Sequence, residues 1–335
     1  MGILKNKRFL VIIVLLVLAS AVAQAEPWSF SVSPLAGVLY GRSDEIVYKR
    51  GNSDTVLSEL LWDLKPLLYA GIGADFAPLY PFEKNSFSAG MTFKCGLPFQ
   101  TGIMEDWDYM NDRFQYPTHY SRHNAFARHA FLFDISGGYS WIFKDNFAFK
   151  AFAEFSYMRF SWSARDGYYQ YPENTADGPQ WSPDMEKNYI HGEIIRYTQN
   201  WFIVSPGISL TAKLGNNFLL SGGLNYSPFI YCSDRDDHYL RGLYFEDIVS
   251  GGHFFKGRLS VLYSPFTDLD FSLDFAYSVI TGSRGDAYTY AESTNGSVFL
   301  GRSYSISGAA YSAFDLALQA KIRLYGRKVK NKIKT

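Results

Sequence analysis

Two short acidic segments of this 335-residue chain carry the residue types that could do chemistry. One runs from Glu105 to Asp108 and the other from Asp234 to His238. A histidine beside a carboxylate is held in one tautomer and can remove a proton from water. Two further carboxylates across a groove can position that water and share a proton. The candidate catalytic residues are therefore Asp106, Asp108, Asp236 and His238.

Other chemistries need to be weighed against this one. Acidic residues that only solvate a protein rim, or that bind a cation, are the simpler alternative on composition alone. A helix-loop-helix calcium loop is excluded, because Met110 stands where an oxygen ligand must follow Asp106 and Asp108. The sequence contains neither a zinc-protease helix motif nor a serine-hydrolase elbow. We therefore predict no metal ion and no cofactor.

The elements that must position these residues are strands. Apolar residues occupy every odd position from Leu269 to Val279, and polar or small residues occupy the even positions. The stretches from Phe147 to Tyr157 and from Phe314 to Leu324 alternate in the same way. A period of two predicts a strand with one apolar and one polar face. Several of these strands exceed the usual length of about 5–6 residues.

Short and long connections alternate along the chain. Short turns are expected near 80–84, 144–146, 215–217 and 265–268, and long loops near 42–55, 103–128, 166–188, 233–243 and 282–296. Outer-membrane barrels have short periplasmic turns and long outer loops. The sequence thus predicts an all-β fold: a single transmembrane antiparallel β-barrel of about ten strands, extending beyond the membrane on the extracellular side.

The two ends of the chain differ from the barrel. Residues 1–25 have a basic start, an uncharged apolar stretch and a small-x-small site at Ala23-Gln24-Ala25, which predicts a cleaved signal peptide. The barrel is expected over 26–325, followed by a basic C-terminal tail over 326–335.

Charge and cysteine content exclude other classes. The formal net charge of +0 gives no indication of nucleic-acid binding. Cys95 and Cys232 are too few for a disulfide scaffold, so we expect free thiols, with one bridge as the alternative in an oxidising periplasm.

The alternation also predicts where the acidic side chains point. From Phe87 onward the apolar odd-numbered residues are expected to face lipid. The even-numbered Asp106 and Asp108 then point into the lumen. Lipid-facing even positions in the first strand turn Glu45 inward. The same rule would turn Asp234, Asp236 and His238 outward, unless a β-bulge near Cys232 reverses the phase.

These motifs, in this order, resemble the omptins, ten-stranded outer-membrane proteases of Gram-negative bacteria. The resemblance covers almost the whole chain after the signal segment, and the most specific motif is Asp-x-Asp-x-His-Tyr. The matching segments are Gly41 with Glu45, Val47 and Tyr48; Asp106-Trp107-Asp108-Tyr109-Met110; Ser121-Arg122-His123; Arg159 to Arg165; and Asp234-Arg235-Asp236-Asp237-His238-Tyr239.

The resemblance implies a role for each matched position. Asp236 and His238 correspond to the pair that activates the attacking water, opposed by Asp106 and Asp108. Glu45 and Asp234 correspond to an acidic pocket for an Arg or Lys side chain before the scissile bond, held by charge-assisted hydrogen bonds. The implied protein is a monomeric endopeptidase of the outer membrane, with its active site facing outside and peptides or proteins with basic residues as substrates.

Two departures from the family pattern qualify these expectations. The second acidic subsite of the family falls near His119, which is not acidic. Omptins need lipopolysaccharide, and Arg159 matches one of the residues that hold it. Tyr157 stands where the family has Glu, and Asn200 where it has Arg. Lipopolysaccharide is thus the expected activator, with another outer-membrane lipid as the alternative.

Two functions of other kinds stay open at this stage. A non-catalytic barrel acting as an adhesin or small pore is the main alternative. Inward side chains such as Lys94, Lys150 and Glu154 should fill so narrow a lumen. A lipid-modifying enzyme is the weaker alternative, because the sequence offers no nucleophile or metal set for it.

Overall fold

The structure is a computed structural model, and it describes residues 28–51, 55–78, 82–111, 113–173, 179–293 and 296–325. The predicted signal peptide, 1–25, and the predicted basic tail, 326–335, lie outside the described residues. Within the described ranges no helix has the length and apolar composition needed to cross a membrane.

The described residues form strands and one short 3-10 helix, η1, over Tyr239–Arg241. The strands are β1 (Trp28–Tyr48), β2 (Val56–Pro78), β3 (Ser86–Gly96), β4 (Gln100–Asp108), β5 (His119–Lys144), β6 (Phe147–Gln170), β7 (Asn188–Leu214), β8 (Phe218–Ser227), β9 (Ile230–His238), β10 (Leu243–Ser250), β11 (His253–Tyr263), β12 (Leu269–Thr281), β13 (Arg284–Ser293) and β14 (Gly296–Tyr325).

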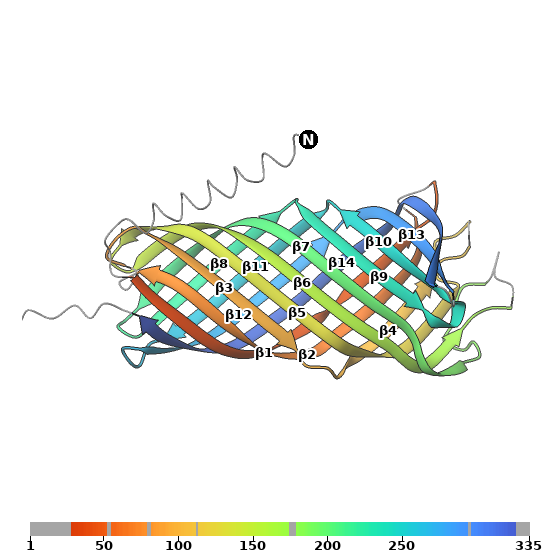
Figure 1. The fold of residues 1–335 in the computed structure, drawn as a ribbon, viewed down its shortest axis with the longest axis horizontal. Coiled ribbons are helices and arrows are strands. Elements are labelled where there is room, and N and C mark those ends of the chain that lie inside the picture. The colour runs from red at the N-terminus through yellow and green to blue at the C-terminus, as the bar shows by residue number, and fades with distance from the viewer. Residues whose placement is uncertain are drawn as a thin grey trace, which may run out of the picture.

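These segments close into the expected antiparallel barrel (Figure 1). Four strands are each interrupted once, so that β3 continues into β4, β8 into β9, β10 into β11 and β12 into β13. Both halves of an interrupted strand share a neighbour, as β7 pairs with β8 and with β9. The ring of about ten strands is closed by the pairing of β1 with β14.

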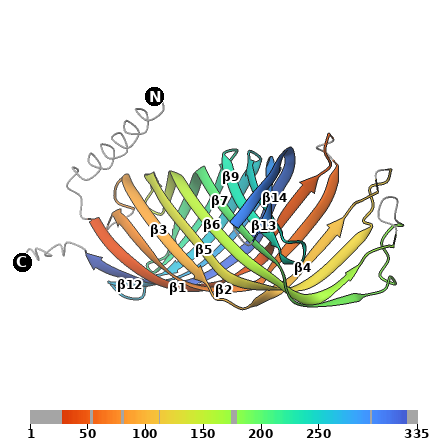
Figure 2. The same ribbon diagram turned by 45° about the vertical axis from the view of Figure 1, so that its right-hand side comes forward.

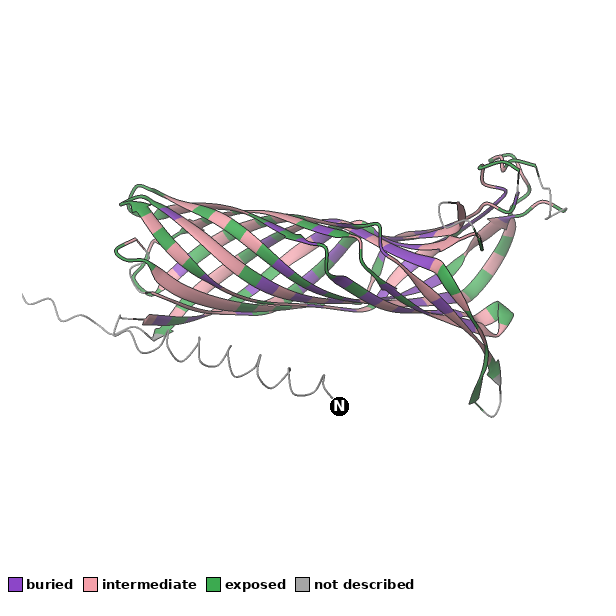
Figure 3. Ribbon diagram, turned by 90° about the horizontal axis from the view of Figure 1, so that it is seen from above, coloured by how far each residue is buried: buried purple, intermediate pink, exposed green. Residues whose placement is uncertain are grey.

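The outer wall carries an apolar band between two aromatic girdles. Near the short turns Trp28 stacks on Phe76 at 4.4 Å and Phe218 on Tyr263 at 4.7 Å between ring centroids. At the other edge of the band Phe202 contacts Tyr231, with centroids 5.8 Å apart. Figure 3 shows exposed residues alternating with the others along the strands between these edges. An apolar band flanked by aromatic girdles is typical of outer-membrane barrels.

The predicted long loops are mostly wrong, because strands continue well beyond the apolar band. In the segment expected as a loop near 233–243, β9 and β10 are separated only by 239–242, and most of the segment expected as a loop near 282–296 is β13 (Arg284–Ser293). Figure 2 shows the β1–β2, β4–β5 and β6–β7 hairpins spreading apart at this end. Beyond the membrane the outward face of a strand meets water instead of lipid, so the apolar–polar alternation that marks a strand in the sequence is lost there.

The barrel interior is filled by side chains. The lower lumen holds ion pairs of Lys94 with Asp315 and of Arg258 with Glu154. Around these groups a polar cavity of about 230 Å³ remains. The inward positions of Lys94 and Glu154 confirm the expectation from the alternation.

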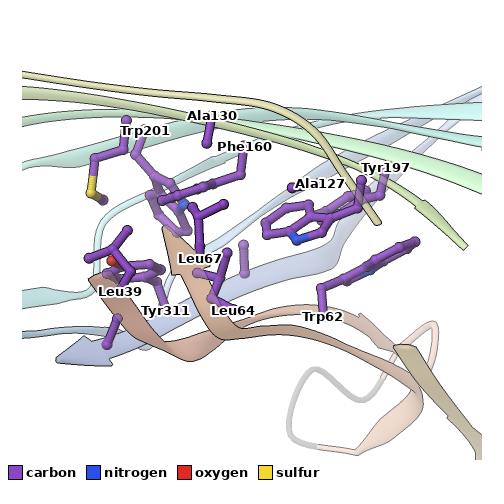
Figure 4. Packing of buried hydrophobic residues seen from close by; sticks show 14 of the residues in the cluster. Leu39, Trp62, Leu64, Leu67, Ala127, Ala130, Phe160, Tyr197, Trp201 and Tyr311 are labelled. Carbon is purple, nitrogen blue, oxygen red and sulfur yellow. The ribbon is translucent and has the colours of Figure 1, made fainter. Parts of the chain in front are cut away.

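A layer of buried apolar side chains lies above this polar lumen. Its members include Trp162. Figure 4 shows Trp62, Trp201, Phe160, Leu39 and Tyr311 of the same layer. Leu39 and Tyr311 line a small cavity together with Lys94, which places the layer directly on the ion pairs. On its other side Trp62 stacks on Tyr197 at 5.5 Å between centroids, and Tyr197 reaches the acidic residues described below. The layer thus separates the lower lumen from the outer end.

Cys95 and Cys232 are both free thiols, as expected. Cys95 is exposed and Cys232 is buried.

Candidate active site

A reversal of strand phase turns the Asp234–His238 segment inward. In β8 the even-numbered residues Leu224 and Tyr226 are exposed, whereas in β9 the even-numbered Asp234 and Asp236 are buried. The phase changes at Pro228 and Phe229, between the two strands, where proline cannot donate a ladder hydrogen bond. The predicted reversal is confirmed, although it lies a few residues before Cys232.

Asp236 and His238 form a hydrogen-bonded pair. The His238 ring uses Nε2 to contact Asp236 Oδ2, and only 1% of Asp236 is exposed. Burial lowers the pKa of His238, but the charge of Asp236 and this hydrogen bond outweigh it, so that the pKa lies above its usual 6.5. Nε2 is therefore engaged by the carboxylate, and no described residue hydrogen-bonds to Nδ1.

Asp106 and Asp108 come from β4 on the opposite side of the barrel mouth. Asp106 is 7% exposed, and Ser58 of β2 donates a hydrogen bond to its Oδ1 at 3.2 Å. Burial and the neighbouring Asp108 raise the pKa of Asp106 to about 8, while the charge of His238 lowers it. Burial also raises the pKa of Asp108. This carboxylate pair therefore retains a proton at neutral pH.

Glu45 and Asp234 lie deeper, next to a further carboxylate, Asp247. Glu45 is 3% exposed, and burial together with Asp236, Asp234, Asp247 and Asp106 raises its pKa well above the usual value. Tyr197 donates a hydrogen bond to Asp234 Oδ2 at 3.1 Å. We call Glu45, Asp234, Asp236 and Asp247 the buried acidic cluster.

Asp106 and His238 line one shared cavity of about 460 Å³. The rest of its lining is mostly aromatic and aliphatic, and comprises Tyr169, Tyr171, Tyr189, Ile190, Ile194, Ile195 and Leu240, with Ser121, His123 and Arg241. A polypeptide segment in this cavity would lie between the carboxylates of β4 and the Asp236–His238 pair. Asp106 and His238, which lie more than a hundred positions apart in sequence, are thus brought to one cavity, and Asp236 bonds to His238 behind it.

His119 stands beside this cavity as a neutral group. Its ring contacts that of Tyr171, with centroids 4.9 Å apart, and its Nδ1 lies 2.8 Å from Thr118 Oγ1. Burial lowers its pKa, although Asp108 opposes this effect. Near where the family's second acidic subsite falls, this chain therefore has an uncharged His119 against an aromatic ring.

Sequence reasoning missed Asp247 and Tyr171. Asp247 could have been found from the hairpin: His238 pairs with Leu243 across the turn, and the same register sets Asp247 opposite Asp234. The turn itself ends at Gly242, whose φ of 60° favours glycine. Tyr171 follows the end of β6 in a connection whose course no local pattern predicts.

Arg159 lies on the outer wall, as its strand phase predicts. It donates hydrogen bonds to Asn200 Oδ1 at 2.7 Å and to His129 Nε2 at 3.1 Å. Tyr157 also donates to Asn200 Oδ1, at 3.2 Å. Of the two positions that depart from the family pattern, Asn200 therefore bonds with Arg159 directly. Tyr157 bonds to the same Asn200 amide oxygen.

Comparison with known proteins decides the family. The Omptin family matches residues 26–323, nearly the whole barrel. The chain belongs to the omptin family. It is 27% identical to the plasminogen activator of Yersinia pestis, over 82% of this chain and 84% of that protein. It is also 27% identical to the outer membrane protease IcsP of Shigella flexneri, over 84% of this chain and 86% of that protein.

The fold comparison agrees with this omptin membership. The crystal structure of the outer membrane protease OmpT from Escherichia coli matches with a TM-score of 0.75 at 21% identity, covering 88% of this chain and 96% of that one. The omptin described here is therefore an outer-membrane β-barrel, and its relatives support a protease function.

Proposed function

We propose that this omptin is an endopeptidase that hydrolyses peptide bonds next to basic residues, with a water activated by His238 and Asp236. The observation that carries the proposal is the shared cavity, which has Asp106 on one side and His238 on the other. With Nε2 of His238 bonded to Asp236, Nδ1 is available to take a proton from water. The attack needs no covalent intermediate, because the nucleophile is water.

Asp106 and Asp108 supply the second half of the mechanism. A pair that holds one proton at neutral pH can hydrogen-bond the attacked carbonyl oxygen or protonate the departing amine. The raised pKa of Asp106, about 8, keeps that proton in place in the range where His238 becomes neutral. Base and acid thus face each other across the scissile bond.

The substrate residue before the scissile bond is an Arg or Lys in this proposal. Glu45 and Asp234 are buried, and no ion pair joins either of them to a described Lys or Arg side chain. An uncompensated buried carboxylate is costly, and a cationic side chain of the substrate would relieve that cost by charge-assisted hydrogen bonds.

Lipopolysaccharide is proposed as the activator, bound on the outer wall at Arg159. The guanidinium of Arg159 is partly exposed next to the apolar band, at the level where lipid head groups meet the protein. Tyr157 and Asn200, which bond there, leave a smaller positive charge than a second arginine would provide. We therefore expect lipopolysaccharide to activate this protein less strongly than a site with a second arginine would allow.

Paired quenched peptides test the proposal. They carry one site with either arginine or its neutral isostere citrulline before the bond, and refolded protein is assayed with and without lipopolysaccharide. We expect the arginine peptide to be cleaved at least about 100-fold faster, the size of effect for leaving buried charges unpaired. Equal rates for the two peptides would contradict the basic specificity. Absence of cleavage in both lipid conditions, by a barrel verified as folded, would contradict the protease.

The residue after the bond should be apolar and not basic. His119 is neutral and Tyr171 contacts it with a tilted ring, while Arg241 repels a second cation in the same cavity. In a peptide library with arginine fixed before the bond, we expect kcat/KM for Val, Ile or Phe after it to exceed that for Lys or Arg by about 10-fold. A preference for Lys or Arg after the bond would contradict this reading of the cavity.

A further inference from the structure

The Asp247 carboxylate is a feature of the acidic cluster that neither the sequence motifs nor the proposed mechanism uses. It lies on β10, opposite Asp234 in register, and is 3% exposed. Ser307 of β14 hydrogen-bonds to its Oδ2. Its Oδ1 is buried and has no hydrogen-bond partner among the described residues.

The free oxygens of the cluster are unevenly distributed. Asp234 already accepts hydrogen bonds from the Tyr197 hydroxyl and from the backbone N–H of Asp247. Glu45 Oε2 and Asp247 Oδ1, by contrast, are both buried and unpartnered. An unpartnered buried carboxylate oxygen costs free energy unless a donor reaches it. Asp247 thus offers a substrate cation more unused acceptor capacity than Asp234 does.

The surrounding charges give no internal partner for Asp247. Besides the Asp236–His238 pair, the described ion pairs on this hairpin join Arg235 to Asp237 at 2.7 Å and to Glu246 at 3.6 Å, and none of them includes Asp247. Asp247 adds to the negative field at Glu45 and at Asp234. A guanidinium group brings five N–H donors, more than one carboxylate can accept.

We propose that Asp247 is a specificity-determining residue that, together with Glu45 and Asp234, binds the cationic side chain of the substrate. Asp247 Oδ1 accepts a hydrogen bond from the guanidinium or ammonium group, while Ser307 fixes the carboxylate through Oδ2. Asp234 mainly supplies charge, since its oxygens are engaged within the hairpin. This inference rests on the proposed cleavage next to basic residues.

Asp247→Asn tests the role, because it removes one charge and keeps the shape of the side chain. Its matched control is Glu246→Gln, which removes one charge from the neighbouring, outward residue of the same strand. Both variants are assayed with the arginine and citrulline peptides after verification of the folded barrel by heat-dependent gel mobility. Asp247→Ser serves as a second substitution if the asparagine variant does not fold.

We expect Asp247→Asn to lower kcat/KM for the arginine peptide by about 10- to 100-fold. The citrulline peptide should change less than about 3-fold, and Glu246→Gln should match the wild type with both peptides. An arginine-to-citrulline ratio equal to that of the wild type would overturn the proposal. So would an equal loss with both peptides, since that indicates only structural support.

The same assay separates this inference from the proposed function. A wild type that does not distinguish arginine from citrulline contradicts the basic specificity itself, and the role of Asp247 with it. A wild type that does distinguish them, beside an Asp247→Asn variant that retains the full ratio, contradicts the role of Asp247 alone.

Discussion

His238→Ala is expected to abolish peptide cleavage while leaving a folded barrel. The substitution removes the group that takes the proton from water, and Asp236 alone cannot replace it because Asp236 is buried and does not line the cavity. The loss should be about 10⁴-fold or more in kcat, as for other residues that act as a unit with their partners. Discontinuous assays with arginine peptides over hours would measure the residual rate.

The matched control for this substitution is His253→Ala. His253 is an exposed histidine on the outer wall, where it lies 2.9 Å from the Tyr226 hydroxyl. The His253→Ala substitution removes an imidazole ring from the same barrel but far from the cavity, so wild-type kcat is expected. Cleavage by His238→Ala at a rate near that of His253→Ala would exclude His238 as the base.

Asp236→Asn is expected to give the second largest effect, together with a shift in pH dependence. The amide can present an N–H to Nε2, which moves the imidazole proton to Nδ1 and removes the acceptor that water needs. A loss of about 10²–10⁴-fold in kcat follows, as when the carboxylate that orients a catalytic histidine is replaced in serine proteases.

The sign of the pH shift follows from the cause of the raised pKa. Cleavage needs neutral His238, so the wild-type rate should rise with pH through a pKa above 6.5. Without the charge of Asp236 the burial of His238 dominates, so the acid limb of the profile should move to lower pH. The alkaline limb, near the pKa of about 8 of Asp106, should stay in place. A kcat/KM profile of the variant whose acid limb is unchanged would contradict the assigned pair.

The membrane-embedded part of this fold could be predicted from the sequence, and the outer part could not. The alternation from Leu269 to Val279 predicts β12 because one face of that strand meets lipid and the other meets the polar lumen. Beyond the lipid this contrast ends, so β9 and β13 were expected as loops although they are paired along their whole length. The pairing partners of such segments depend on the tertiary fold.

The candidate site was predictable where a sequence motif marks it. The strand phase placed Glu45 and Asp106 inward correctly, and it placed Asp234 correctly only once a phase reversal was assumed. Asp247 is part of no motif, and its burial follows from the register across the turn at Gly242. The tyrosines of the cavity come from ends of strands whose course is set by contacts distant in sequence.

The interruptions at Pro228, at Gly251–Gly252 and at Gly282–Ser283 lie side by side, because Ser250 pairs with both Tyr231 and Arg284. We call this row of interruptions the seam. Across it, the inward-facing positions of each of these neighbouring strands change between odd and even residue numbers. In β9, β10 and β13 the choice of inward-facing residues is therefore independent of whether odd- or even-numbered residues face inward in the strands below. An odd number of residues added to β8, β11 or β12 would be absorbed at these breaks, whereas in the uninterrupted β1 it would turn Glu45 outward.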